Sequence, residues 1–179
     1  MIRSISAKAG KFWRKEDGHA VVEFALTFPA MLVLLLSGIE LGMVSLQHAM
    51  LERAMDQTVR DIRLSTGTAP QHDEIKRLLC ERSGFISNCN NNMLLEMVQL
   101  NPRNWTGISA TASCTDQSEE VQPKVEFKND ALENDLMILR ACVKVDPIFP
   151  TTGLGKNVAK DGAGQFALVS ISAFVQEPN

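Results

Sequence analysis

The apolar segment from Phe24 to Ile39 limits what this chain can become more than any other part of it. The segment reads FALTFPAMLVLLLSGI and carries no charged side chain. Its length is at the short end of the roughly 17–25 residues that cross a bilayer as a helix. A span over residues 22–46 reaches a comfortable length, although it then includes Glu23 and Glu40. The sequence therefore predicts one transmembrane helix near the N-terminus.

The flanks of this segment predict its orientation. Residues 1–18 form a basic leader, and after the apolar run no Lys or Arg occurs until Arg53. Basic flanks favour the cytoplasmic side of a membrane. We therefore expect a cytoplasmic leader, a single membrane pass, and residues beyond about 47 on the other side of the membrane.

The helical pattern continues beyond the apolar segment. There is no Gly or Pro from Met43 to Ser65, which leaves nothing to break a helix there. Apolar residues recur on one helical face: Val44, Leu51, Met55, Val59 and Ile62. We predict one long helix over residues 19–65, apolar all round in its first half and amphipathic in its second. The amphipathic half needs an apolar surface to cover it.

The second part of the chain, residues 66–179, has the pattern of one small α+β domain. A short helix is predicted over residues 73–83, followed by a polar loop at 87–92, and a Gly-rich loop is predicted from Gly153 to Gly164. The strand candidates are residues 93–100, 108–114, 124–128, 137–145 and 166–175. The last candidate is apolar or small on both faces, which predicts a central strand. The fold class is thus α+β, with a long N-terminal helix packed on a small antiparallel β-sheet.

All four cysteines lie in the second half of the chain, at Cys80, Cys89, Cys114 and Cys142. An even number of cysteines outside the cytoplasm favours disulfides. We prefer the pairs Cys80–Cys89 and Cys114–Cys142, while the other two connectivities and four free thiols stay open.

No catalytic, cofactor or metal site is predicted. The histidines His19, His48 and His72 are far apart, and no nucleophile elbow or phosphate-binding loop occurs. The net charge of −3 provides no basic excess for nucleic acid. A structural role is therefore favoured over an enzymatic one.

The segment that carries the functional prediction is Gly18-His-Ala-Val-Val-Glu23-Phe24, between the basic leader and the apolar run. Gly18 leaves the following peptide bond open to a peptidase because it has no Cβ. Glu23 places a carboxylate at the rim of an apolar helix. Inserting a charged side chain at the bilayer centre costs about 2.5–3.5 kcal/mol, so a carboxylate here indicates a function.

This segment resembles the processing site of type IV prepilins. The longer stretch DGHAVVEFALTFPAMLVLLLSGIELG resembles the N-terminal signature of TadE-like pseudopilins of the tight-adherence (Flp) pilus. The closing VQEP at 175–178 is similar to the family's usual ending. Phe24, where major Flp pilins have Tyr, and the large C-terminal region match minor pseudopilins better than major pilins.

The resemblance implies a role and a set of partners. A prepilin peptidase would cut between Gly18 and His19, and Glu23 with Phe24 would take part in subunit assembly, Glu23 by pairing with the N-terminal ammonium of a neighbour. The other implied partners are the major Flp-type pilin, sister minor pseudopilins, the inner-membrane assembly platform and membrane lipid.

The implied location is the bacterial inner membrane, with the C-terminal domain periplasmic, or extracellular once in a pilus. Two alternatives stay open. One is a single-pass envelope protein with a periplasmic binding domain that does not join a filament. The other is a secreted protein with a cleaved signal peptide, which the absence of an A-x-A site and the continuing helical pattern disfavour.

Overall fold

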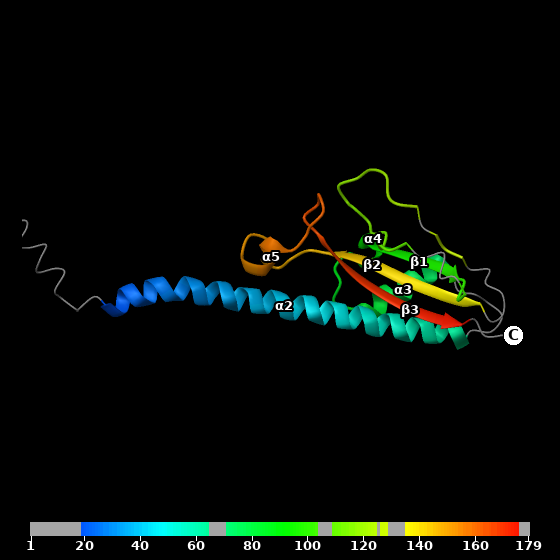
Figure 1. Ribbon diagram of the computed structural model, residues 1–179, viewed down its shortest axis with the longest axis horizontal. Coiled ribbons are helices and arrows are strands. Elements are labelled where there is room, and N and C mark those ends of the chain that lie inside the picture. Colours follow the sequence, from blue (N-terminus) through cyan, green and yellow to red (C-terminus); the bar gives the residue numbers. More distant parts are fainter. Residues whose placement is uncertain (1–18, 65–70, 104–108, 125, 129–134, 176–179) are drawn as a thin grey trace, which may run out of the picture.

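The computed structural model describes residues 19–64, 71–103, 109–124, 126–128 and 135–175. A long helix runs beneath a small sheet and projects far beyond it (Figure 1). In chain order the elements are α2 (His19–Leu64), α3 (His72–Ser83), α4 (Cys89–Asn92), β1 (Met93–Leu100), β2 (Leu136–Val145), α5 (Gly153–Asn157) and β3 (Phe166–Val175). The fold class is α+β, as predicted.

Helix α2 has 46 residues, which at 1.5 Å per residue gives a length of about 69 Å. The amphipathic face predicted for its second half is the buried one, and it includes Leu51, Met55, Val59 and Ile62. These side chains join those of α3 and the inner face of the sheet in one core. The amphipathic half of α2 is thus an integral part of the folded domain.

The sheet has three antiparallel strands in the order β1-β2-β3. The strands predicted at 93–100 and 166–175 are confirmed, and the one at 137–145 begins one residue earlier. The inner face of the sheet packs against the helices and includes Met93, Leu95, Leu139 and Val143, all with no measurable exposure.

Three expectations about the sheet are wrong. Residues 109–114 form no strand, and within 124 and 126–128 only Phe127 makes a single bridge to Met97. Strand β3 is an edge strand, and β2 is the central one. On β3 the alternate residues Ala167, Ile171 and Val175 are exposed, so its apolar character on both faces did not mean burial.

Two predicted loops contain short helices. Residues 89–92 of the polar loop form α4, and residues 153–157 of the Gly-rich loop form α5. Helix α5 does not lie on the sheet. It packs against the first half of α2, where it extends the domain along the helix (Figure 1).

Candidate assembly and membrane-anchoring site

The residues proposed for assembly lie at the exposed start of helix α2. Gly18 is outside the described residues, and α2 begins at His19. The Nδ1 atom of His19 lies 3.0 Å from Oε1 of Glu23, one helical turn later, and both side chains are mostly exposed. Phe24 is 62% exposed, and its ring stacks on that of Phe28 with centroids 4.9 Å apart.

This arrangement leaves Glu23 with a weak partner. The imidazole of His19 is charged only when protonated, and a pair between two exposed side chains contributes little. Among the described residues no Lys or Arg pairs with Glu23. The carboxylate therefore faces outward at the edge of an apolar surface, where a cation from another chain can reach it.

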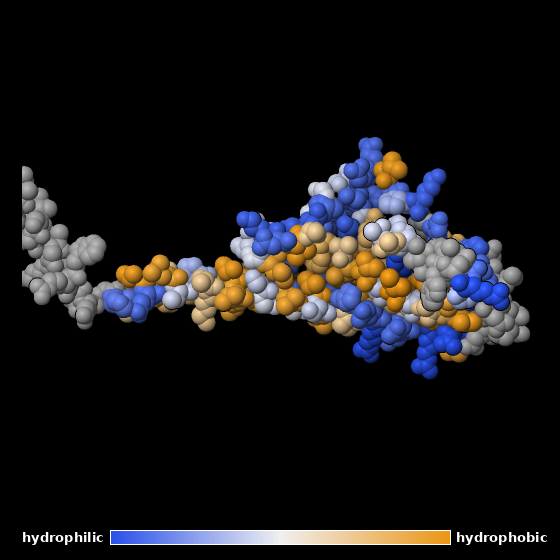
Figure 2. Space-filling model, viewed as in Figure 1, coloured by the Kyte–Doolittle hydropathy of each residue, from blue (hydrophilic) through white to orange (hydrophobic). Residues whose placement is uncertain are grey.

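Residues 19–35 of α2, which we name the stem, are all exposed. An 18-residue window within this helix is apolar enough to cross a membrane, and none of it is buried in the rest of the protein. Figure 2 shows this surface as the apolar stem to the left of the folded domain. Its most exposed large side chains include Val21, Leu26, Met31 and Leu34. A surface of this kind requires a bilayer or neighbouring helices to cover it.

Beyond the exposed stem, the folded domain first contacts α2 around Glu40. Glu40 is the only charged residue of α2 that is fully buried. Its side chain is 2% exposed, and its two carboxylate oxygens accept hydrogen bonds from the backbone N–H groups of Ile148 and Phe149, at 3.0 and 2.8 Å. The bonds tie residues 147–157, which we name the α5 loop, to the helix. The charge of Glu40 is thus compensated by two oriented backbone donors.

A second attachment lies one turn earlier on the helix. The hydroxyl of Ser37 accepts a hydrogen bond from the backbone N–H of Leu154 at 3.2 Å and donates one to the carbonyl of Val33. Gly153 has a φ of +54°, and a Cβ at this position would lie 2.3 Å from the Ser37 oxygen. Glycine is therefore required for the α5 loop to approach the helix this closely.

Residues 18–60 match the family model described as TadE-like protein. This N-terminal segment is thus similar to TadE-like proteins. The matched residues include the outward-facing Glu23, the uncovered stem, Glu40 and most of the buried face of α2. TadE-like proteins belong to the tight-adherence pilus system and are structural. Comparison of the whole chain with curated proteins and with solved structures finds no match in either set.

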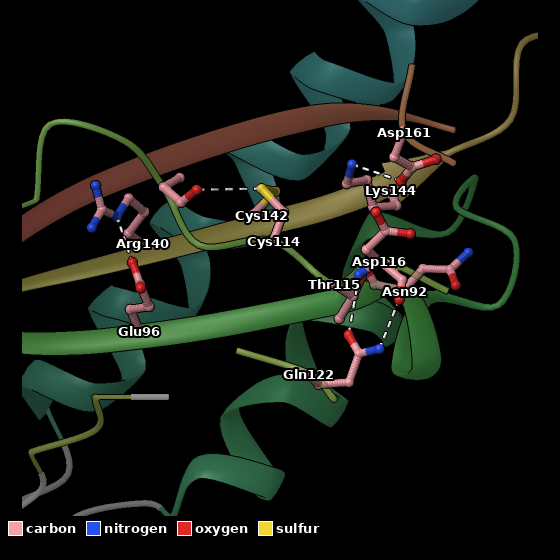
Figure 3. The surroundings of a disulfide bond; sticks show 11 residues. Asn92, Glu96, Cys114, Thr115, Asp116, Gln122, Arg140, Cys142, Lys144 and Asp161 are labelled. Atoms are coloured by element: carbon pink, nitrogen blue, oxygen red, sulfur yellow. Dashed lines mark hydrogen bonds and ion pairs between the residues drawn. A yellow bond between two sulfur atoms is a disulfide. The ribbon is translucent and has the colours of Figure 1, made fainter. Parts of the chain in front are cut away.

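Two disulfides cross-link the domain that follows the TadE-like segment. Cys80 bonds Cys89, which joins α3 to α4, and Cys114 bonds Cys142, which joins the coil at 109–124 to β2. This is the pairing preferred from the sequence. Figure 3 shows the second disulfide, on the face of the sheet opposite α2.

Two buried ion pairs lie on the same face. Arg140 donates from Nε to Glu96 at 2.7 Å and from its NH1 group to the carbonyl of Ser109 at 2.9 Å. Lys144 pairs with Asp161 at 2.7 Å. Burial opposes ionisation of Asp161, but hydrogen bonds from Lys144 and from the backbone of Gln165 and Ala163 outweigh it and hold its pKa below the ordinary value. These pairs attach the coil and the loop before β3 to the central strand.

The described residues contain no group of three or more His, Cys, Asp or Glu side chains placed to hold a metal ion. What the sequence interpretation missed is the role of Glu40 and Ser37. A signal was present, because a carboxylate inside an apolar helix needs a partner, but the partners are backbone groups more than 100 residues away.

Proposed function

We propose that this chain is a minor pseudopilin, a structural subunit for the assembly of a tight-adherence (Flp) pilus, and that it is not an enzyme. The observation that supports this most is the division of α2. Residues 19–35, within the segment that matches the TadE-like model, are mostly apolar and exposed, while the second half of α2 belongs to the core of the domain. Such a subunit is held by the bilayer before assembly and by neighbouring helices afterwards.

The proposal includes a topology and a set of partners. The leader at 1–18 is cytoplasmic, the membrane segment lies at about 22–46, and residues 66–179 form a periplasmic domain that becomes extracellular in a pilus. The partners are the major Flp-type pilin, sister minor pseudopilins, the inner-membrane assembly platform and a prepilin peptidase. Location of the cysteine-bearing domain outside the cytoplasm agrees with its two disulfides.

Processing gives the first test. In cells that contain the peptidase, we expect cleavage between Gly18 and His19, so that the purified protein begins at His19. A bulky residue in place of Gly18 should block the cut by shielding the scissile bond, whereas Gly18→Ala should be cut in part. Intact-mass measurement with and without the peptidase checks this. Full-length protein alone in peptidase-positive cells would contradict it and favour the envelope protein that does not join a filament.

Glu23 gives the second test. In a filament its carboxylate would meet the freed ammonium of a neighbour in surroundings of low dielectric, where a close pair gains more than in water although desolvation offsets much of the gain. We expect Glu23→Ala to leave protein level, processing and disulfides intact and to reduce the number of pili, or the amount of this subunit recovered with them. Glu23→Gln should show nearly the same loss of pili as Glu23→Ala, because glutamine keeps the shape of the side chain but lacks its charge.

The chain offers a matched control for Glu23. Glu52 also lies four residues after a histidine on α2, 3.7 Å from His48, and its side chain is 58% exposed. It lies outside the apolar stem, so Glu52→Ala should leave piliation and recovery with pilin unchanged. Normal piliation in the Glu23→Ala strain would show that Glu23 is only an interfacial residue.

A further inference from the structure

The α5 loop is attached to the helix at a depth that a bilayer would reach. Glu23 and Ser37 are fourteen residues apart on one helix, which corresponds to about 21 Å, whereas the hydrocarbon core of a bilayer is about 30 Å thick. With Glu23 at one rim, Ser37 and the loop bonded to it lie inside the opposite rim. If His19 is placed at the rim instead, the distance from the rim to Ser37 is about 27 Å, which is still shorter than the hydrocarbon core. Any tilt of the helix shortens the depth that it spans and brings the loop further into the bilayer.

The composition of the loop fits such a position. Pro147 is buried, Ile148 is 46% exposed, Phe149 is half-buried and Lys156 is exposed. The loop carries no carboxylate between 147 and 157. Exposed apolar side chains in the same segment as a lysine that can extend toward phosphate groups are typical of the membrane interface.

The Glu40 carboxylate at this level is shielded by the fold and hydrogen-bonded. Glu40 is covered by the loop itself, and its oxygens accept two backbone hydrogen bonds. The neighbouring helix residues Leu34, Leu35, Ile39 and Leu41 are 46–75% exposed. Acyl chains that surround these residues also reach the loop that lies against the same stretch of helix.

We propose that the α5 loop is a second membrane contact, inserted at the headgroup boundary of the leaflet that faces the folded domain, with Ile148 toward the acyl chains and Lys156 toward lipid phosphates. It would hold the domain against the bilayer at a fixed height. The proposal rests on the proposed membrane anchoring of α2 and not on incorporation into a filament.

Depth-dependent quenching tests this in the full-length protein. Trp13 and Trp105 are replaced by Phe, and a single tryptophan is placed at Ile148 or, as a second reporter on the loop, at exposed Thr151. Leu34→Trp on the uncovered helix serves as the membrane reference. Val121→Trp, at a side chain that is 85% exposed on the coil at 109–124, serves as the reference outside the membrane. Each variant is reconstituted into phosphatidylcholine vesicles with and without bromine on the acyl chains, and its disulfides are checked by mass.

We expect both loop reporters to lose part of their emission in brominated vesicles, less than Leu34→Trp near the bilayer centre, while Val121→Trp keeps its emission. If Leu34→Trp is quenched and both loop reporters behave like Val121→Trp, the loop contact is refuted while the anchor stands. Loop emission that is blue-shifted but unquenched means that protein covers the loop, which also overturns the proposal. If Leu34→Trp itself is not quenched, the membrane anchoring is wrong and the loop contact falls with it.

Discussion

Replacement of Glu40 by alanine is expected to detach the α5 loop from helix α2. The change removes the acceptor for the N–H groups of Ile148 and Phe149, and it empties a position that is 2% exposed. Each hydrogen bond to a charged group contributes about 1.5–3 kcal/mol, and a buried donor left unpaired costs about 1–3 kcal/mol. The loop can partly relax toward solvent, so we expect a loss of about 2–4 kcal/mol in its local opening free energy.

Hydrogen exchange of the full chain in detergent micelles measures this loss directly. The amides of residues 148 and 149 should exchange much faster in Glu40→Ala, with a smaller increase in Glu40→Gln, because the amide retains one oxygen acceptor. Core amides of β2 should keep their protection. Glu52→Ala, at an exposed position of the same helix, is the control. Unchanged protection at 148 and 149 in Glu40→Ala would mean that these hydrogen bonds do not hold the loop.

The elements that sequence reasoning predicted well are those with a strong local signal. Helix α2 was predicted because a continuous apolar segment is followed, from Met43 to Ser65, by apolar periodicity without Gly or Pro. Strands β1 and β3 alternate or are bounded by polar turns, and their limits were predicted to the residue. The α+β plan then follows, because an amphipathic helix and a sheet each need one face covered.

The wrong predictions concern the neighbours of an element in the fold, which its own sequence does not specify. Strand β3 is apolar or small on both faces, yet its position at the edge depends on the two partners of β2, which the sequence of β3 does not contain. Conversely, β2 carries Arg140 and Lys144, which argue against burial on a single-sequence reading. In the fold, Glu96 from β1 and Asp161 from the loop before β3 pair with these cations. Side-chain partners from distant segments decide such cases.

The candidate site likewise combines features with a local sequence signal and features that depend on distant residues. The segment from Gly18 to Phe24 was singled out by its resemblance to prepilin processing sites, and the roles proposed for its residues stay predictions. Attachment of the α5 loop was not predicted, since its donors are backbone N–H groups that any sequence supplies. Only Gly153 marks the place, and its need for a positive φ becomes evident once Ser37 is seen against it.

Arg140→Met should destabilise the domain by about 3–5 kcal/mol, which is the usual cost of removing one partner from a buried ion pair. The side chains of Arg140 and Glu96 are only 7% and 10% exposed, so Glu96 would be left as a charge without its cation. The bond from Arg140 to the carbonyl of Ser109 is lost as well, which loosens the coil next to the Cys114–Cys142 disulfide. Thermal unfolding in detergent with the disulfides intact measures the effect.

Two further variants separate the charge effect from simple loss of packing. Arg77→Met removes a surface pair with Glu81 whose side chains are 54% and 58% exposed, and it should cost no more than about 0.5 kcal/mol. The double variant Glu96→Leu with Arg140→Met removes both buried charges together. Replacing a buried pair by apolar side chains is often close to neutral, so the double variant should recover much of the stability lost in Arg140→Met. A double variant as unstable as the single one would show that Arg140 acts through packing and its bond to Ser109, and not through its charge opposite Glu96.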